Sequence, residues 1–287
     1  MDFGMISYEA LQEGSFHLPA PPTGVLSGRK NQWPRVRVGL PTWGKKQWVG
    51  NLFPAGTRQE AFLGEYVRHF DAVELNATHY KIYDEGSITR WADKAGEHDF
   101  MFCPKFPAAI SHYSGFERTE ALTDAFLRGI SAFGDRLGPL LLQLSERYSP
   151  LQQEKLFNYL ASLPRDLPVF LELRHPHWFD GSPAARQLPA RLQTLLKGLV
   201  ITDTPGRRDL VHMQLTLPRA YVRFVCQGDE PLDRFRISQW QQTLSRWFDQ
   251  GLEDCHFFLH IHQEKSVPDF ARYVQEVFAP WSPPPSK

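Results

Sequence analysis

The sequence has few cysteines and no net charge, and each of these shortages excludes a class of protein. Cys103, Cys226 and Cys255 are odd in number, widely spaced and set in apolar runs. They predict buried, reduced thiols and neither a disulfide framework nor a CxxC zinc site. The 32 basic and 32 acidic side chains cancel, so the chain as a whole has no electrostatic attraction to nucleic acid or to a membrane surface.

Long hydrophobic runs are also missing. No segment reaches the roughly 18 uninterrupted apolar residues of a membrane span, and residues 1–30 lack the basic start and apolar stretch of a secretory signal. Hydrophobic residues nevertheless make up 42% of the 287, which is enough for a sizeable core. We therefore expect a soluble, cytoplasmic protein with no membrane partner.

Short apolar runs of strand length recur along the body of the chain. The predicted strands are Val36–Leu40, Ala72–Leu75, Phe100–Cys103, Leu140–Leu144, Val169–Leu173, Leu199–Thr202, Ala220–Phe224 and Cys255–Leu259. Amphipathic patterns between them predict helices at Thr57–Phe70, Ser87–Lys94, Glu120–Leu137, Pro150–Leu163, Pro183–Lys197, Ile237–Gln250 and Val267–Phe278. Thr57 to Glu60 and Ser149 to Gln152 resemble capping boxes. The connection Thr204–Arg219 shows no helical pattern.

Strands that alternate with helices are typical of parallel β/α units. Eight of them favour a TIM-type (β/α)8 barrel over an open doubly wound sheet, and no glycine-rich phosphate fingerprint follows the first run. Proline and glycine punctuate the two ends of the chain. We expect an N-terminal arm over residues 1–34, a single barrel domain over 35–281 and a C-terminal tail over 282–287.

Polar side chains gather at the carboxyl ends of these runs, where barrel enzymes carry their active sites. Because side chains alternate across a strand, the residues expected to face the interior there are Glu74, Asn76, Lys105, Gln143, Glu172, Arg174, Asp203, Arg223 and His260. The set predicts a site at the mouth of the barrel. The alternative is that some members are internal ion pairs that hold the mouth together.

Three carboxylates of this set, Glu74, Glu172 and Asp203, are the candidate catalytic groups. Carboxylates at a barrel mouth can act as acid and base when burial raises one pKa and a neighbouring arginine lowers another, and glycoside hydrolysis uses such a pair. Alternatively, Arg174 and Arg223 hold Glu172 and Asp203 as structural pairs. Glu74 has no cation nearby in the sequence and is the preferred acid–base candidate.

The cations Lys105, Arg174 and Arg223, with His112 and His175, suit a phosphate or carboxylate group, because arginine offers a planar fork and lysine a compact charge. We expect a small anionic, hydroxylated ligand and, if there is turnover, a hydrolase, lyase or isomerase reaction. The opposing view is that three positive and three negative charges at the mouth neutralise one another.

Aromatic residues fall in the loops after the first, second and fifth runs, where rings can stack on a sugar or a base or simply pack as a cap. They are Trp43, Trp48, Tyr80, Tyr83 and Trp178. The full set of ligand-binding candidates is Trp43, Asn76, Tyr80, Lys105, His112, Gln143, Arg174, His175, Trp178, Arg223 and His260.

A metal site is the weaker interpretation. His256, His260 and His262 share strand parity, but the three cations would have to share the mouth with the ion, so we expect no metal and no cofactor. A metal-dependent phosphodiesterase and a module that binds a nucleic-acid backbone stay as alternatives. Ser111-His112 lacks a nucleophile elbow, and Cys103 should lie deeper in the barrel.

Several motifs in order resemble a known family. They are VGLPTWGKKQWVGNLFP, FDAVELNATHY, RWADKAGEHDFMFCPKFPAAISHY, LGPLLLQLS, FLELRHPHWF and AYVRF. Across residues 36–278 the chain is similar to the bacterial YecE-like family, domain of unknown function 72. The resemblance implies a TIM-type barrel and carries no established activity. The residues of this chain that match the family's motifs are Glu74, Asn76, Tyr80, Lys105, His112, Gln143, Glu172, Arg174, His175, Trp178 and Arg223.

The chain departs from the usual family pattern at three places. His79 stands where an apolar or aromatic residue is common, Val225–Gln227 replaces a His-Gly pair, and His260–His262 replaces an asparagine-rich strand end. The resemblance therefore says least about the ends of the seventh and eighth runs.

Overall fold

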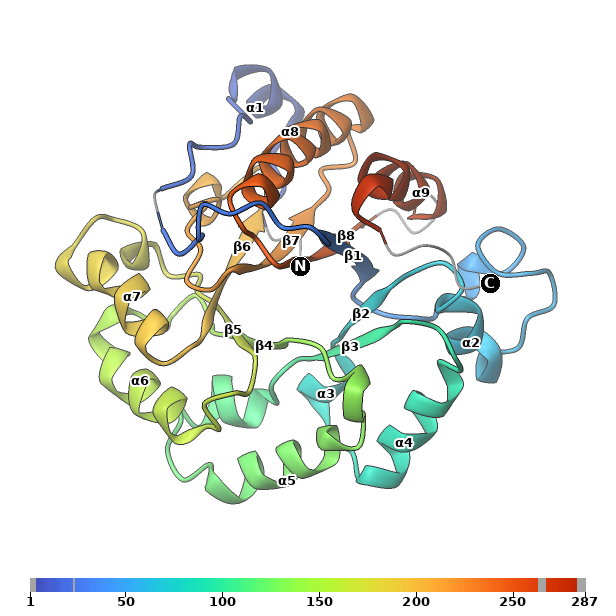
Figure 1. Cartoon of the computed structure of the whole chain (residues 1–287), viewed down its shortest axis with the longest axis horizontal. Helices are drawn as coiled ribbons and strands as arrows, with labels where there is room; N and C mark the ends of the chain where they lie inside the picture. The colour runs from blue at the N-terminus through green and yellow to red at the C-terminus, as the bar shows by residue number, and fades with distance from the viewer. Residues whose placement is uncertain (1–3, 23, 263–266, 283–287) are drawn as a thin grey trace.

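Eight parallel strands form the wall of a barrel with helices around it (Figure 1), in a computed structural model that describes residues 4–22, 24–262 and 267–282. The strands are β1 (Arg35–Leu40), β2 (Ala72–Leu75), β3 (Met101–Pro104), β4 (Leu140–Gln143), β5 (Val169–Glu172), β6 (Gly198–Asp203), β7 (Arg219–Val225) and β8 (Asp254–His260). Each lies within one residue of a predicted run at both ends. The predicted TIM-type barrel is confirmed.

The strands follow the order β3-β2-β1-β8-β7-β6-β5-β4, and the paired strands are parallel. The seam between β3 and β4 is closed by two isolated bridges, Phe102 with Leu137 and Lys105 with Leu141, in place of a full ladder. The barrel is therefore nearly closed, with its loosest junction between β3 and β4.

An apolar layer fills the middle of the barrel. Its members are Ala72, Cys103, Leu141, Phe170, Val200, Tyr221 and Phe258, one from each strand from β2 to β8. The first strand contributes Gly39, where a Cβ would lie 2.3 Å from the carbonyl oxygen of Ala72. The residues between these positions face outward and join the larger core beneath the helices.

The helices around the barrel are mostly those that the amphipathic patterns predict. They are α2 (Phe62–Tyr66), α3 (Ala77–Tyr80), α4 (Glu85–Lys94), α5 (Glu120–Ser131), α6 (Gln153–Ser162), α7 (Pro183–Thr194), α8 (Glu230–Asp249) and α9 (Val267–Phe278), and α1 (Tyr8–Glu13) precedes the barrel. None of the helices in the described ranges combines the length and the apolar character needed to cross a membrane.

Two helix predictions were wrong at their starts. Thr57 donates its hydroxyl to the Pro54 carbonyl and caps no helix, so the expected helix begins later, with a 3-10 turn at Gln59–Ala61 that leads into α2. Helix α8 begins before the predicted Ile237, because Asp229 caps it by accepting a hydrogen bond from the Leu232 N–H.

The connection from β6 to β7 contains only a short 3-10 turn, Arg208–Leu210, among its ordered elements, as predicted. The N-terminal arm covers this side of the barrel and runs beside α8 (Figure 1). Leu18, Val25 and Leu26 of the arm pack against the core. The arm therefore occupies the place of the helix that the sixth β/α unit lacks.

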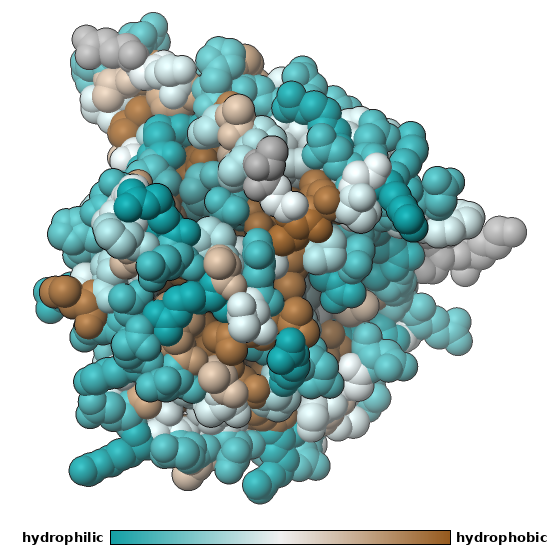
Figure 2. Space-filling view, turned by 60° about the vertical axis from the view of Figure 1, so that its left-hand side comes forward, coloured by the Kyte–Doolittle hydropathy of each residue, from teal (hydrophilic) through white to brown (hydrophobic). Residues whose placement is uncertain are grey.

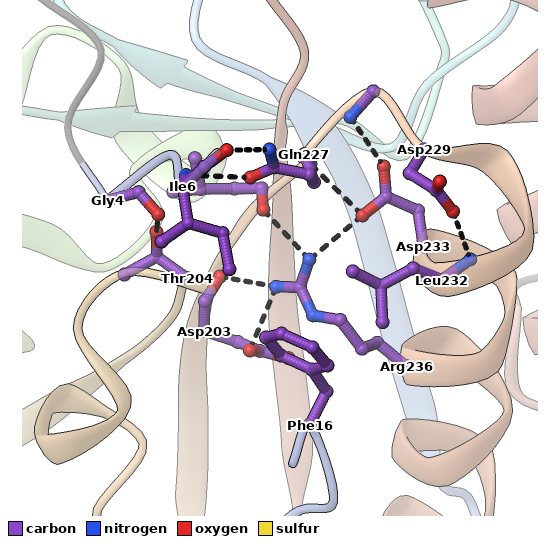
Figure 3. Close-up of polar contacts among 12 residues, drawn as sticks. Gly4, Ile6, Phe16, Asp203, Thr204, Gln227, Asp229, Leu232, Asp233 and Arg236 are labelled. Carbon is purple, nitrogen blue, oxygen red and sulfur yellow. Dashed lines mark hydrogen bonds and ion pairs between the residues drawn. The ribbon is translucent and has the colours of Figure 1, made fainter. Parts of the chain in front are cut away.

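The arm is tied to the barrel through its backbone. The Gln239 side chain of α8 accepts a hydrogen bond from Leu18 N and donates one to Phe16 O. Near the mouth, Gln227 forms a similar pair of hydrogen bonds with Ile6 (Figure 3). The exterior on the α7 side is mostly hydrophilic, with apolar side chains in small patches (Figure 2).

Candidate functional site

A polar layer lies directly above the apolar layer, two residues further along each strand. Its members are Glu74, Lys105, Gln143, Glu172, Thr202, Arg223 and His260, which we call the mouth layer. The alternation of strand side chains points these residues into the barrel at the carboxyl ends of the strands. Six of the seven are among the predicted site residues.

Arg223 joins two carboxylates at the centre of the mouth layer. Its Nε and Nη2 donate to Glu74 Oε2 and Oε1 at 2.9 and 3.0 Å, and its Nη1 donates to both oxygens of Glu172 at 2.9 and 2.7 Å. All three nitrogens of the guanidinium are therefore engaged inside the protein. Arg223 organises the site and is poorly placed to clamp a ligand.

Other side chains also donate hydrogen bonds to the two carboxylates. Glu172 Oε1 accepts hydrogen bonds from Arg174 Nε at 3.0 Å and from Thr202 Oγ1 at 3.1 Å. Glu74 accepts from Tyr221 Oη at 3.2 Å and from Asn76 Nδ2 at 3.3 Å. Both carboxylates are thus held in place from several strands.

These partners keep both carboxylates ionised. Burial alone raises the pKa of Glu74, but the charge of Arg223, together with the neighbouring His260 ring, outweighs it and holds that pKa well below its usual range. Burial is likewise outweighed at Glu172, where the charges of Arg174, Arg223 and Lys105 lower the pKa to about 2. A carboxylate with so low a pKa is a weak base and a poor proton donor at neutral pH, which argues against the predicted acid–base role of Glu74.

Lys105 lies in the mouth layer with a different environment. Its Nζ donates to Gln143 Oε1 at 2.6 Å, and within the described ranges it forms no ion pair with a carboxylate. The side chain is 8% exposed. Burial, followed by the positive charge of Arg223, lowers the Lys105 pKa to about 8.

His260 completes the layer on the β8 side. Its Nε2 lies 3.4 Å from Glu74 Oε1, in a contact that falls short of a hydrogen bond, so this buried nitrogen has no hydrogen-bond partner among the residues described. Burial and the charge of Arg223 lower the His260 pKa, which favours the neutral ring at neutral pH.

Asp203 does not belong to the mouth, and its predicted inward orientation was wrong. Its carboxylate contacts Arg208 at 2.6 Å, Arg236 of α8 at 2.9 Å and Trp240 Nε1 at 2.7 Å (Figure 3 shows the contact with Arg236). Arg236 also pairs with Asp233 of the same helix. Asp203 therefore faces outward and joins β6 to α8, while Thr202 takes the inward position.

Comparison with known proteins agrees with this architecture. The family model described as "Protein of unknown function DUF72" matches residues 37–286. The chain belongs to the DUF72 family. The UPF0759 protein YecE of Escherichia coli K12 is 29% identical over 264 residues, which cover 86% of this chain and 91% of YecE. The UPF0759 protein YunF of Bacillus subtilis is 25% identical over 152 residues, which cover 50% of this chain and 52% of YunF.

Solved structures of DUF72 proteins share the fold. A family protein from Enterococcus faecalis V583 has a TM-score of 0.64 at 18% identity, over 85% of this chain and 98% of that one. Another from Thermotoga maritima MSB8 has a TM-score of 0.63 at 21% identity, over 85% and 99%. At these identities the likeness establishes the barrel of this DUF72 protein and nothing about its ligand.

The aromatic candidates of this DUF72 protein take different positions around the mouth. Trp178 is buried, and its Nε1 donates to the Tyr148 carbonyl oxygen at 2.8 Å, so it packs in the core. Trp43 is half-buried with its ring edge-on to Trp91. Tyr80 is 85% exposed. A stacking role is therefore least compatible with Trp178, where the ring is enclosed by protein.

The histidine candidates also separate. His112 contacts Ser111 Oγ at 2.8 Å, and burial together with the charge of Lys105 lowers its pKa, which places it beside the mouth layer. His175 accepts a hydrogen bond from His177 N in the loop after β5. His256 lies at the opposite end of β8, 3.4 Å from Asp254.

The strand-eight histidines therefore do not converge on one point. His260 is in the mouth layer, four residues further along β8 than His256. His262 is exposed beyond the end of β8. In the ranges that the structure describes, no three His, Cys, Asp or Glu side chains are grouped so that they could hold a metal ion.

Two residues of the site were missed by sequence reasoning. Thr202 and Tyr221 both donate hydrogen bonds to the carboxylates of the mouth layer. The signal for Thr202 was present, because Leu199 and Ile201 are outward apolar positions and Thr202 follows them with the opposite parity. In the sequence, Tyr221 looks like any other aromatic residue of a buried strand. Only the fold shows that its hydroxyl donates a hydrogen bond to Glu74.

Proposed function

We propose that the mouth of the barrel binds a small anionic, hydroxylated compound that carries a phosphate or carboxylate group. The observation that supports this most is the charge of the site. Among the residues that the structure describes, and with Asp203 on the outer side of the wall, the mouth holds two carboxylates, Glu74 and Glu172. Three cations, Lys105, Arg174 and Arg223, lie beside them, so the described side chains at the mouth carry one positive charge in excess.

The excess charge lies at Lys105. Arg223 is shared between the two carboxylates, and Arg174 pairs with Glu172 at 3.0 Å. Lys105 instead contacts the neutral amide of Gln143. A buried cation without a counter-ion is costly, because desolvation is not offset by an opposite charge. An anion that reached Lys105 would lower this cost, which favours binding.

Neighbouring groups suit the rest of such a ligand. The Arg174 side chain is 15% exposed, whereas its partner Glu172 is 1% exposed, so Arg174 is the more accessible member of this ion pair. On the other side of the mouth layer, His260 Nε2 has no hydrogen-bond partner among the described residues, although it lies 3.4 Å from Glu74 Oε1. These groups can accept or donate hydrogen bonds to hydroxyls, while Glu74 and Glu172 hold Arg223 and set the polarity of the site.

A ligand panel measured by thermal shift tests the proposal. Phosphorylated and carboxylated hydroxy compounds should raise the midpoint of the wild-type protein, and the increase should vanish in Lys105→Gln and fall in Arg174→Gln. Arg219→Gln is the matched control, because Arg219 lies at the first residue of β7, at the far end of the barrel, and pairs there with Glu253.

The control variant should keep the full ligand response, since its charge change is the same as that of Arg174→Gln. Either of two results would overturn the proposal: no anion in the panel shifts the wild type, or the shift persists unchanged in Lys105→Gln. Single-stranded and double-stranded oligonucleotides belong in the same panel, because a response to these alone would favour the backbone-binding alternative.

A further inference from the structure

We propose that Lys105 is a Schiff-base lysine, whose amine forms a covalent imine with the carbonyl carbon of an anionic aldehyde or ketone. The inference rests on the anion site proposed above and assigns that site a substrate class and a reacting atom. On this proposal, carbonyl compounds react covalently with the protein at the mouth of the barrel.

The surroundings of Lys105 differ from those of a structural lysine, and the same chain supplies the comparison. Lys197 is 1% exposed, and its Nζ donates to three backbone carbonyl oxygens at 2.9 to 3.3 Å. All three of its N–H groups are thereby used. Lys105 Nζ meets one acceptor, Gln143 Oε1, among the described residues. Its remaining N–H groups, and its lone pair once it is neutral, are left for a ligand.

The position of Lys105 also fits a reacting group. It sits in the layer of side chains at the carboxyl ends of the strands, where barrel enzymes carry out their chemistry. The Gln143 contact fixes the direction of the amine from β4, the neighbouring strand across the seam. An amine held in this way reacts more readily than one on a mobile surface chain.

The electrostatic environment makes the amine available. Burial and the charge of Arg223 lower the Lys105 pKa to about 8, compared with 10.5 for an ordinary lysine. Roughly a tenth of the protein then carries the neutral amine at pH 7. Desolvation and a neighbouring cation are the means by which lysine nucleophiles are activated in general.

The covalent step balances without a cofactor. The neutral amine attacks the carbonyl carbon, an N–C bond forms and the carbonyl oxygen becomes a hydroxyl. The C–O bond then breaks as the oxygen leaves. Overall, the lysine ammonium and the carbonyl compound give a protonated imine and one water, and two of the ammonium protons leave on that water. The protonated imine withdraws electrons from the adjacent carbon, which is what lyase and isomerase reactions of carbonyl compounds require.

Reductive trapping on the wild-type protein tests this directly. The protein is incubated with a carbonyl compound and cyanoborohydride, digested, and mapped by mass spectrometry. Glyceraldehyde 3-phosphate supplies a phosphate, pyruvate supplies a carboxylate, and neutral glyceraldehyde controls for indiscriminate modification. We expect a stable adduct at Lys105 with at least one of the two anions, and a large loss of labelling there with neutral glyceraldehyde.

Lys197 is the internal control in the same digest and should stay unlabelled. The Lys105→Arg variant keeps the positive charge but has no reactive amine, so it should bind the anion in the thermal-shift assay and give no adduct at this position. Labelling of Lys105 no greater than that of Lys197, in protein that binds the same anions, would overturn the Schiff-base inference and leave the anion site standing. Absence of anion binding together with absence of labelling would overturn both.

Discussion

Lys105 Nζ lies 2.6 Å from Gln143 Oε1, so the ammonium group of a buried lysine is met by a neutral amide and not by a carboxylate. The two carboxylates of the mouth are instead bound by Arg223. This division of partners leaves Lys105 as a buried charge that costs the folded protein stability.

Replacing Lys105 by methionine should stabilise the folded protein. Methionine fills a similar volume and removes the desolvated charge. The depressed pKa corresponds to roughly 1–3 kcal/mol in the free energy of unfolding at pH 7. Chemical denaturation of the two proteins measures the difference.

The pH dependence of that gain has a definite sign. The Lys105 pKa is about 8 in the folded state and 10.5 in the reference state, so between these values the unfolded chain binds more protons and wild-type stability rises with pH. The advantage of Lys105→Met should therefore shrink as pH increases through this window. Lys197→Met is the matched control and should destabilise by about 1–3 kcal/mol, because three charge-assisted hydrogen bonds to backbone carbonyl oxygens are lost.

Removing Arg223 should have the opposite effect. In Arg223→Met, Glu74 loses its arginine partner and Glu172 keeps only Arg174, and breaking a buried pair in this way costs about 3–5 kcal/mol. Equilibrium unfolding measures the loss. Arg219→Met should change stability by less than about 1 kcal/mol, since its partners are exposed. Equal losses in the two variants would contradict the central position of Arg223.

Low pH should destabilise the folded protein through protonation of Glu172. Its folded-state pKa is about 2, below the ordinary value of 4.5, so its stabilising contribution is complete above that ordinary value and is lost as pH falls from about 5 towards 2. Glu172→Gln should therefore unfold with a shallower dependence on pH across this window than the wild type. Acid titration followed by circular dichroism gives the two slopes, and identical slopes would contradict the assignment.

The outward orientation of Asp203 separates structural effects from binding effects. Asp203→Asn should leave anion binding unchanged, because the carboxylate lies on the far side of the β6 wall from Lys105. It should lower stability by up to about 3 kcal/mol, because the fully buried Arg236 loses one of its two carboxylate partners. Thermal shift with and without the anion measures both quantities.

Asp209→Asn serves as the control in that experiment. Asp209 is exposed and pairs with Arg207, so its replacement should affect stability little. A loss of anion binding in Asp203→Asn, with the fold intact, would return Asp203 to the mouth and change the charge balance of the site.

The barrel could be predicted from the sequence because its signals are local. Each strand is a short apolar run, and capped amphipathic helices separate the runs, so both the number of strands and their ends follow from periodicity. Helix α8 shows the limit of this reasoning. Its first turns carry Asp233 and Arg236 on a buried side, which hides the helical pattern until the partner Asp203 is known.

The site was predictable in position and less so in detail. The period of two put Glu74, Lys105, Glu172 and Arg223 in one layer, because each follows a buried residue of the same parity. It does not say which cation meets which carboxylate, since that depends on contacts between strands far apart in sequence. Arg223 takes both carboxylates because β7 carries it between β2 and β5, and Lys105 is left with Gln143 for the same reason.

An anomalous-scattering map of crystals soaked in tungstate tests anion binding at the mouth, because the heavy anion marks where this protein attracts negative charge. We expect a peak in the mouth of the barrel within hydrogen-bonding distance of Lys105 Nζ, and its loss in Lys105→Gln crystals. A mouth without a peak, while tungstate binds at exposed arginines such as Arg219, would show that the mouth is no anion site.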